Sequence, residues 1–345
     1  MDVLVYLPLL VPALAAATAR PLAARLEPRL ATWLLTAVTV ALAAFSAAAL
    51  ALLAASALAR VPALAALGGY SQSALHRGDP VPVHTGVTAA LLLTAAAVAV
   101  AVVIRARARG LAEAYRRAAL MAPDGPVVIV PGQAIEAYAL PGAPGRIVVS
   151  GRLLDALDDR GRAALLAHEQ AHLAARHHLF TTVAHLAAAA NPLLLPVARA
   201  VDYTVERWAD ERAATATGDR RLVAATIGRV ALLTPARPRR THAAALAITG
   251  THRPAGTRGT LGPAGTRGTH GPAGTRGSAR NHGRRISLAW AGPVPRRVAA
   301  LLAPPPGRQL ALLAVATLLV LIAGVSAAEA ARDLHALVEF AQSAR

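Results

Sequence analysis

The sequence contains no cysteine and no lysine, and aromatic residues make up only 3% of its 345 residues. The absence of cysteine excludes disulfide bonds, thiolate metal ligands and cysteine nucleophiles together. Any zinc site in this chain must therefore use histidine and carboxylate side chains. The absence of lysine means that all 36 basic residues are arginine, and the net charge is +18. Such an excess is typical of proteins that contact nucleic acid or anionic membranes.

Charged residues are also missing from long apolar stretches of the chain. Residues 30–59, 86–104 and 309–328 are uncharged, and each is long enough to cross a bilayer, which takes roughly 17–25 helical residues. A further run, 3–19, lies at the short end of that range. We interpret it as a span rather than a signal peptide because no basic residue precedes it. These runs predict a mostly α-helical, polytopic membrane protein.

The arginines that flank the apolar runs predict the orientation of the chain. They concentrate between the first and second runs, after the third and before the fourth, and few lie on the opposite side. The first group comprises Arg20, Arg25, Arg29, Arg105, Arg107, Arg109, Arg296, Arg297 and Arg308, and the second Arg60, Arg77, Arg332 and Arg345. By the positive-inside rule, we expect a multi-pass plasma-membrane protein with its N-terminus outside and residues 105–308 in the cytoplasm. The basic excess thus indicates topology and attraction to the lipid bilayer, and no direct contact with nucleic acid is expected.

The same features divide the chain into five expected parts. These are a three-span membrane unit over 1–104, a cytoplasmic domain over 105–233, a basic flexible loop over 234–308, a fourth span over 309–328 and a short extracytoplasmic tail over 329–345. The loop contains nine-residue Gly/Pro/Thr/Arg repeats with glycine at every third position. A collagen-like rod is the alternative, but the repeats hold less than the roughly 15–20% proline typical of collagen.

Short alternating runs begin the cytoplasmic part, and helical patterns follow them. The runs 126–130, 136–140 and 146–150 are separated by Pro-Gly turns and predict a small sheet. Asp158 and Asp159 suit the start of a helix that we expect to continue over 160–178.

The next apolar segment, 179–201, is interrupted by Asn191-Pro192. A single crossing of the membrane here would separate His168 from Glu206. We therefore expect a helical hairpin that lies against the membrane or dips into it, followed by helices over 197–217 and 219–233.

The segment His168-Glu169-Gln170-Ala171-His172 carries the chemistry of the chain. Two histidines four residues apart on a helix project from one face and can share a zinc ion. Glu169, beside the first histidine, is placed to act as general base toward a water that attacks a peptide carbonyl. The alternative is a polar helix surface with no metal. The spacing favours an H-E-x-x-H metallopeptidase with one zinc ion per chain.

A third protein ligand is needed, and two residues compete for the role. His178 stands where an elongated H-E-x-x-H-x-x-G-x-x-H motif would place its last histidine, but Ala175 replaces the glycine that turns the chain. Glu206 is the better candidate. It shares a helix face with Asp210, which we expect to hold a ligand histidine through its second ring nitrogen.

Weaker candidates surround this set. Tyr203, one turn before Glu206, is a possible oxyanion donor, although ordinary packing is the more common role for such a residue. Residues 146–150 are a candidate edge strand for an extended substrate, with ordinary sheet structure as the alternative. His177 and His178 are expected to form hydrogen bonds or to lie at the interface, and His185 to be buried or interfacial, rather than to bind the metal.

These residues together resemble the membrane metallopeptidases of the beta-lactam-sensor (BlaR/MecR) type. The stretches that carry the resemblance are Ala137-Tyr138-Ala139-Leu140-Pro141-Gly142, Ile147-Val148-Val149-Ser150, Leu153-Leu154, Ala167-His168-Glu169-Gln170-Ala171-His172, Arg176-His177-His178, Asn191-Pro192-Leu193 and Glu206 with Asp210. HtpX-like and CAAX prenyl peptidases share the histidine motif and a similar acidic arrangement. Two departures are Glu136-Ala137-Tyr138 in place of the Asn-Ala-Phe strand motif of HtpX-type enzymes, and the lack of a penicillin-binding sensor domain.

The resemblance implies a gluzincin-like α+β zinc peptidase domain on a helical membrane unit. It implies zinc ligation by His168, His172 and Glu206, with Glu169 as general base and Asp210 behind a ligand. It also implies an endopeptidase that cleaves a cytoplasmic or membrane-proximal protein, for instance a transcriptional repressor. Membrane-protein quality control, as in the HtpX-like group, and a non-catalytic membrane scaffold are the alternatives.

Overall fold

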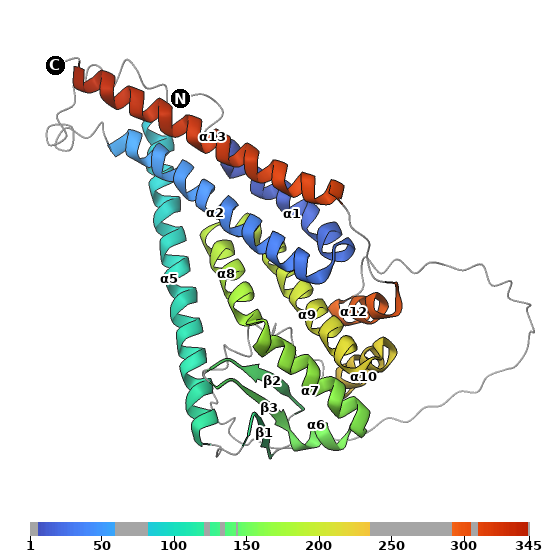
Figure 1. The fold of residues 1–345 in the computed structure, drawn as a ribbon. Helices are drawn as coiled ribbons and strands as arrows, with labels where there is room; N and C mark the ends of the chain where they lie inside the picture. The colour runs from blue at the N-terminus through green and yellow to red at the C-terminus, as the bar shows by residue number, and fades with distance from the viewer. Residues whose placement is uncertain are drawn as a thin grey trace, which may run out of the picture.

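The structure is a computed structural model that describes residues 6–58, 82–120, 125–131, 135–142, 144–234, 292–304 and 310–343. It is mostly helical, with one small sheet (Figure 1). The helices are α1 (Leu7–Arg25), α2 (Pro28–Leu58), α5 (Val83–Leu120), α6 (Gly151–Asp155), α7 (Asp159–Ala174), α8 (His177–Ala190), η2 (Pro192–Leu194), α9 (Leu195–Thr217), α10 (Arg220–Leu233), α12 (Pro293–Leu302) and α13 (Leu310–Ser343).

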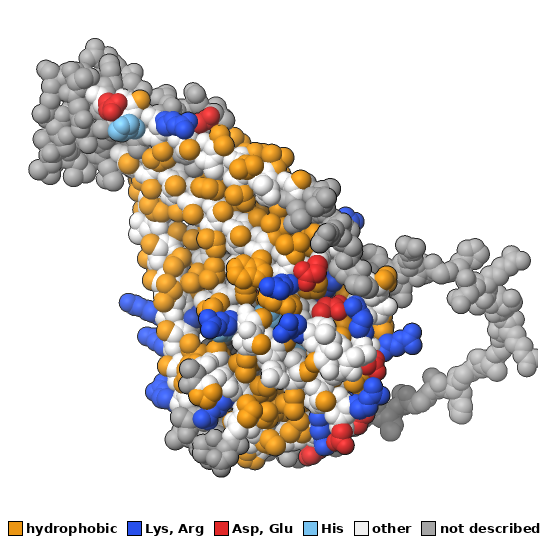
Figure 2. Space-filling view, in the orientation of Figure 1, with side chains coloured by type: hydrophobic (Ala, Val, Ile, Leu, Met, Phe, Trp, Pro, Cys, Tyr) orange, Lys and Arg blue, Asp and Glu red, His pale blue; other side chains and the backbone are white. Residues whose placement is uncertain are grey.

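Among the described residues, three helices are long and apolar enough to cross a membrane: Leu7–Arg25, Pro28–Ala55 and Val83–Arg116. They coincide with the first three predicted spans, although α5 continues without a break to Leu120, well beyond the expected end at residue 104. In α13 the described apolar stretch is shorter and comprises Ala316–Ser326. The helix continues beyond it into the predicted tail. Apolar side chains dominate the surface around these helices, whereas charged side chains gather around the rest of the molecule (Figure 2).

The predicted hairpin is present and is inserted among the apolar helices. Its arms, α8 and α9, pack against each other and against α2, and α9 also contacts α1. At the tip, Asn191 Nδ2 donates to Ser46 Oγ at 3.0 Å, and Ser46 Oγ donates to the carbonyl of Pro8 at 2.7 Å. Because Ser46 lies about 27 Å along α2 from Pro28, the tip reaches deep among these helices. The hydrogen bonds satisfy polar groups that an apolar environment would otherwise penalise.

The three predicted strands form one sheet in the order β1 (Val127–Val130), β3 (Arg146–Ser150) and β2 (Ala137–Leu140). β1 is parallel to β3, and β2 is antiparallel to it. The prediction of β3 as an edge strand for substrate is therefore wrong, because both of its edges are paired. Since α7 packs against β2 as well as β3, β2 is the edge strand beside the motif helix.

The predicted flexible loop over 234–308 is too long at its C-terminal end. Residues 235–291, which include the repeats, lie outside the described residues, but α12 is an ordered helix within the predicted loop. Val298 and Leu301 of α12 pack into an apolar cluster with α10. Arg220 also holds the C-terminal end of α12, because its Nε donates to the carbonyl of Leu301 at 2.9 Å and its Nη2 to that of Ala300 at 3.0 Å. The chain thus returns to the domain after the repeats.

Candidate metal centre

The helix that carries the histidine motif, α7, begins at the predicted place. Asp158 caps it, and its carboxylate accepts a hydrogen bond from the backbone N–H of Gly161 at 3.0 Å. A side chain at position 161 would meet this carboxylate, because a Cβ there would lie 2.8 Å from Asp158 Oδ1. The cap and the glycine therefore fix the start of α7, and hence the direction in which its histidines point.

Three candidate ligands converge between α7 and α9. His168 Nε2 lies 3.1 Å from His172 Nε2, 3.6 Å from Glu206 Oε2, and His172 Nε2 lies 3.7 Å from Glu206 Oε1. Their ligand atoms all lie within 4.8 Å of one another, so the three side chains could hold a metal ion. The helical spacing brings the histidines together, and the packing of α9 against α7 adds the carboxylate.

The donor set and its dimensions fit zinc. Ligand atoms about 2.0–2.1 Å from a tetrahedral zinc ion lie roughly 3.3 Å apart, close to the separations of 3.1–3.7 Å seen here. Two imidazoles and one carboxylate are also the ligands of many catalytic zinc sites, which leave one position open.

Both histidines are held from behind through their Nδ1 atoms. Asp210 Oδ1 lies 3.0 Å from His168 Nδ1, and His177 Nδ1 lies 3.0 Å from His172 Nδ1. Burial disfavours the protonated form of His168, but its hydrogen bonds with Asp210 and Glu206 outweigh burial and raise its pKa to about 10. Burial lowers the pKa of His177 to about 4, so this imidazole is neutral. These contacts direct the Nε2 atoms of His168 and His172 toward the centre.

The position of His177 depends on a sharp turn that the sequence did not reveal. The predicted helix over 160–178 ends at Ala174, and Arg176 adopts a left-handed conformation with φ of 51°. The chain then starts α8 in a new direction, which leaves His177 only 1% exposed beside His172. The turn that the elongated motif would assign to glycine at position 175 thus occurs one residue later. His178 is not part of the group that could hold a metal.

A buried arginine from α12 completes the electrostatics of the centre. Arg297 Nε and Nη2 donate to the two carboxylate oxygens of Asp210 at 2.8 and 2.6 Å, and its Nη1 lies 2.8 Å from Glu206 Oε2. Burial opposes the charge on Arg297, but the two carboxylates outweigh it and raise its pKa. Burial likewise disfavours ionised Asp210, yet Arg297 and His168 lower the pKa of this carboxyl below its usual value. Asp210 therefore stays ionised in the interior.

The sequence reasoning missed Arg297, because it counted this residue among the topological arginines of a flexible loop. Because carboxylates inside the protein neutralise its charge, Arg297 should not be counted among the arginines that indicate the orientation of the chain. A signal was present: Gly292-Pro293 can start a helix, and Val294, Val298 and Leu301 follow at helical spacing.

The remaining predicted site residues lie nearby. Glu169 follows His168 on α7 and is 6% exposed. Tyr203 is buried in the core formed by α1, α2 and α9. Its ring is covered by Arg296 at 4.5 Å and approached by Arg207 at 5.9 Å. These contacts are those of a packing residue.

The comparisons with known proteins agree with this geometry. Residues 102–276, just over half of the chain, match the model of peptidase family M48. The three candidate ligands and Glu169 lie within the matched range, whereas Arg297 lies beyond it. Neither the curated proteins nor the solved structures gave a significant match.

Proposed function

The chain belongs to peptidase family M48, a family of zinc metallopeptidases, and on this basis we propose that it is a membrane-bound zinc endopeptidase. The observation that carries the proposal is the convergence of His168, His172 and Glu206 beside the buried Glu169. A non-catalytic scaffold would not need a carboxylate directly beside a complete set of ligands.

In this proposal, His168, His172 and Glu206 hold one zinc ion per chain. When bound, zinc supplies a Lewis acid that polarises the scissile carbonyl and acidifies the attacking water. Glu169 takes the proton from this water and delivers it to the departing amine. Asp210 and His177 orient the ligand imidazoles, and Arg297 neutralises Asp210 and the ligand Glu206.

Strand β2 is the proposed platform for the substrate. Among the described residues it forms strand pairs only with β3, so its other edge is the one that a substrate strand would join. An extended peptide that pairs with this edge would lie beside α7, which packs against β2. Main-chain pairing tolerates many sequences, so we expect an endopeptidase with little dependence on individual side chains.

The location of the site sets the expected substrate class. If the N-terminus is outside the cell, as the flanking arginines predict, the ends of α1 and α2 near the centre are the cytoplasmic ones. Arg207, one residue after Glu206, donates to the carbonyls of Ala23 and Ala24 at the end of α1 at 2.9 and 3.3 Å. We therefore propose a cytoplasmic or membrane-proximal protein substrate. Repressor cleavage in a signalling pathway stays a prediction that rests on the sequence resemblance alone.

For Tyr203 the contacts favour packing over oxyanion stabilisation, because its ring is enclosed by two arginines. Tyr203→Phe separates the two roles. Loss of the hydroxyl should leave the rate of peptide cleavage nearly unchanged if Tyr203 packs, and should lower it strongly if the hydroxyl stabilises the oxyanion.

The function is tested with purified wild type, Glu169→Gln, Glu206→Ala and a control, Asp155→Asn, which alters an exposed acid on α6. We expect Glu169→Gln to retain zinc while cleavage of an unfolded protein such as casein falls by about 10²–10⁴-fold. Glu206→Ala should lose both zinc and activity, and the control should resemble wild type. A full equivalent of zinc in Glu206→Ala would exclude this residue as ligand, and unchanged cleavage by Glu169→Gln would exclude the mechanism.

A further inference from the structure

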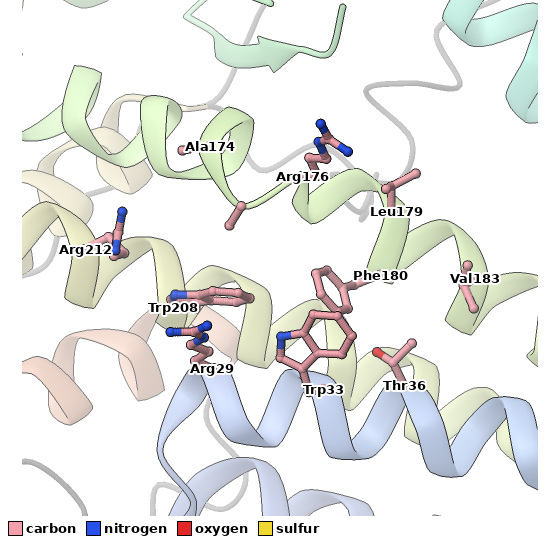
Figure 3. Close-up of a pocket in the computed structure, with 11 residues that line it drawn as sticks. Arg29, Trp33, Thr36, Ala174, Arg176, Leu179, Phe180, Val183, Trp208 and Arg212 are labelled. Atoms are coloured by element: carbon pink, nitrogen blue, oxygen red, sulfur yellow. The ribbon is translucent and has the colours of Figure 1, made fainter.

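A cavity of about 600 Å³ lies between α2, the α7–α8 turn with the start of α8, and α9 (Figure 3). Three arginines and three aromatic residues form most of its wall: Arg29, Arg176, Arg212, Trp33, Phe180 and Trp208. Nothing in the proposed peptidase mechanism uses this cavity.

The cavity carries positive charges that no carboxylate of the described residues neutralises through an ion pair. Among the described residues, Arg29, Arg176 and Arg212 form no ion pair with a carboxylate, and all three are exposed. The guanidinium of Arg29 faces the ring of Trp208 at 5.8 Å. Elsewhere in the domain, arginines such as Arg220 and Arg297 pair with carboxylates. Three unpaired guanidinium groups around one cavity favour an anion with several oxygen atoms, because each group can donate two hydrogen bonds to it.

The other end of the cavity is apolar. Leu179 and Val183, one turn apart on α8, are 48% and 39% exposed, and Trp33 is 57% exposed. Figure 3 places Arg29 and Arg212 toward one end and Leu179 and Val183 toward the other, with Arg176 between them. Edge-to-face contacts continue along the wall, with 4.7 Å between the ring centroids of Trp33 and Phe180.

The apolar end points along the candidate membrane span of α2. Arg29 and Trp33 lie near the start of the α2 stretch Pro28–Ala55, which is long and apolar enough to span a bilayer. α8 packs along α2 and approaches the hairpin tip beyond Val183. Tryptophan at the start of such a helix is typical of the membrane–water interface, where a lipid phosphate would lie.

From this arrangement we propose that the cavity binds one anionic phospholipid such as phosphatidylglycerol. Its phosphate contacts Arg29 and Arg212 at the cationic end, and the upper part of an acyl chain lies along Trp33, Leu179 and Val183. A free phosphate would use only the cationic end, whereas the lipid uses both ends and is supplied by the bilayer at high local concentration.

The cavity contains its own optical probe, because Trp33 and Trp208 are two of the three tryptophans of the chain. In a Trp290→Phe background, tryptophan fluorescence therefore comes from the cavity alone. The protein is reconstituted in phosphatidylcholine nanodiscs with a rising fraction of phosphatidylglycerol, and either one lipid or the other is brominated near the top of the chain. We expect brominated phosphatidylglycerol to quench the fluorescence at a low mole fraction and to saturate. Brominated phosphatidylcholine should quench only in proportion to its abundance.

Charge-matched variants distinguish the cavity from the general basic surface. Arg29→Gln with Arg212→Gln removes two charges from the cavity, and Arg221→Gln with Arg229→Gln removes two exposed charges from α10. We expect the first pair to raise the phosphatidylglycerol fraction at half-quenching by about tenfold. The second pair should shift it less than about twofold, because screening weakens distant charges.

Several results would overturn the proposal. These are equal quenching by the two lipids at equal fractions, an equal shift in both variant pairs, or release of the lipid by millimolar inorganic phosphate, which would assign the cavity to a soluble anion. Native mass spectrometry of the wild-type chain provides an independent check. It should retain one phosphatidylglycerol and no phosphatidylcholine, and retention without this selectivity would equally exclude the site.

Discussion

The metal centre and the arginine cavity share α9 and the end of α7, yet their charges are arranged in opposite ways. At the metal centre, Arg297 faces Glu206 and Asp210, so nearly every charge has a partner within the protein. In the cavity, the three arginines have no such partners among the described residues. Internal pairing fixes side chains in position for a small metal ion. Unpaired charges of one sign instead leave binding capacity for a ligand from outside.

The largest expected effect comes from removing the charge of Arg297, which pairs with two carboxylates at the metal centre. Arg297→Met leaves Asp210 and Glu206 buried without their counter-charge, which costs about 3–5 kcal/mol when one partner of a buried pair is removed. The thermal unfolding midpoint and the zinc content should both fall. Arg296→Met, the adjacent residue that faces Tyr203, is the control, and equal stability of the two variants would contradict the assignment of Arg297.

The two adjacent histidines after the turn offer the next comparison. His177 contacts His172 directly, whereas His178 lies outside the metal-binding group. We expect His177→Ala to weaken zinc affinity by about 10–100-fold, as for other partners of metal ligands. His178→Ala should leave it nearly unchanged. Competition with a chelator of known affinity measures both, and the reverse order would return His178 to consideration as a ligand.

A carboxylate placed in the cavity should pair with the arginines there, as the carboxylates of the metal centre pair with Arg297. Ala174→Asp introduces an acid among the three arginines at an exposed position that lines the cavity. We expect about tenfold weaker preference for phosphatidylglycerol over phosphatidylcholine, measured by the quenching assay. Ala174→Asn has nearly the same shape and should retain the preference. If both variants behave alike, shape rather than charge governs the cavity.

The smallest effect concerns the hairpin that places both regions. Asn191 and Ser46 interact at its tip, and such hydrogen bonds between membrane helices contribute about 0.6 kcal/mol on average. A double-mutant cycle with Asn191→Ala and Ser46→Ala, based on unfolding free energies in detergent, should give a coupling of this size. Lipid preference should not change in either single variant. A coupling of zero would mean that packing alone holds the tip.

The fold was predictable wherever local pattern governs local structure. The three strands, the capped start of α7, the break at Asn191-Pro192 and the end of α9 at Gly218, with φ of 68°, follow from spacing and turn residues. The turn at Arg176 was not predictable, because arginine rarely adopts a positive φ and no glycine marks the site. The central position of β3 also escaped prediction, since strand order depends on contacts between segments.

At the candidate site the same division holds. The helical period alone brings His168 and His172 to one face, and Glu206 with Asp210 to another, so these four residues could be named from the sequence. Their partners could not be named in the same way. Arg297 forms a hydrogen bond with Asp210 although the two residues are 87 positions apart in the chain. The repeats between them do not indicate that the chain comes back to the metal centre.

The sequence by itself determined a histidine-motif helix, a hairpin and a set of long apolar helices, because each depends on interactions between residues a few positions apart. Only the tertiary structure decided which charges are paired and which are left free. The physical reason is that pairing depends on distance in space: Arg297 and Arg212 are both arginines near α9, yet one is buried against two carboxylates and the other faces an open cavity.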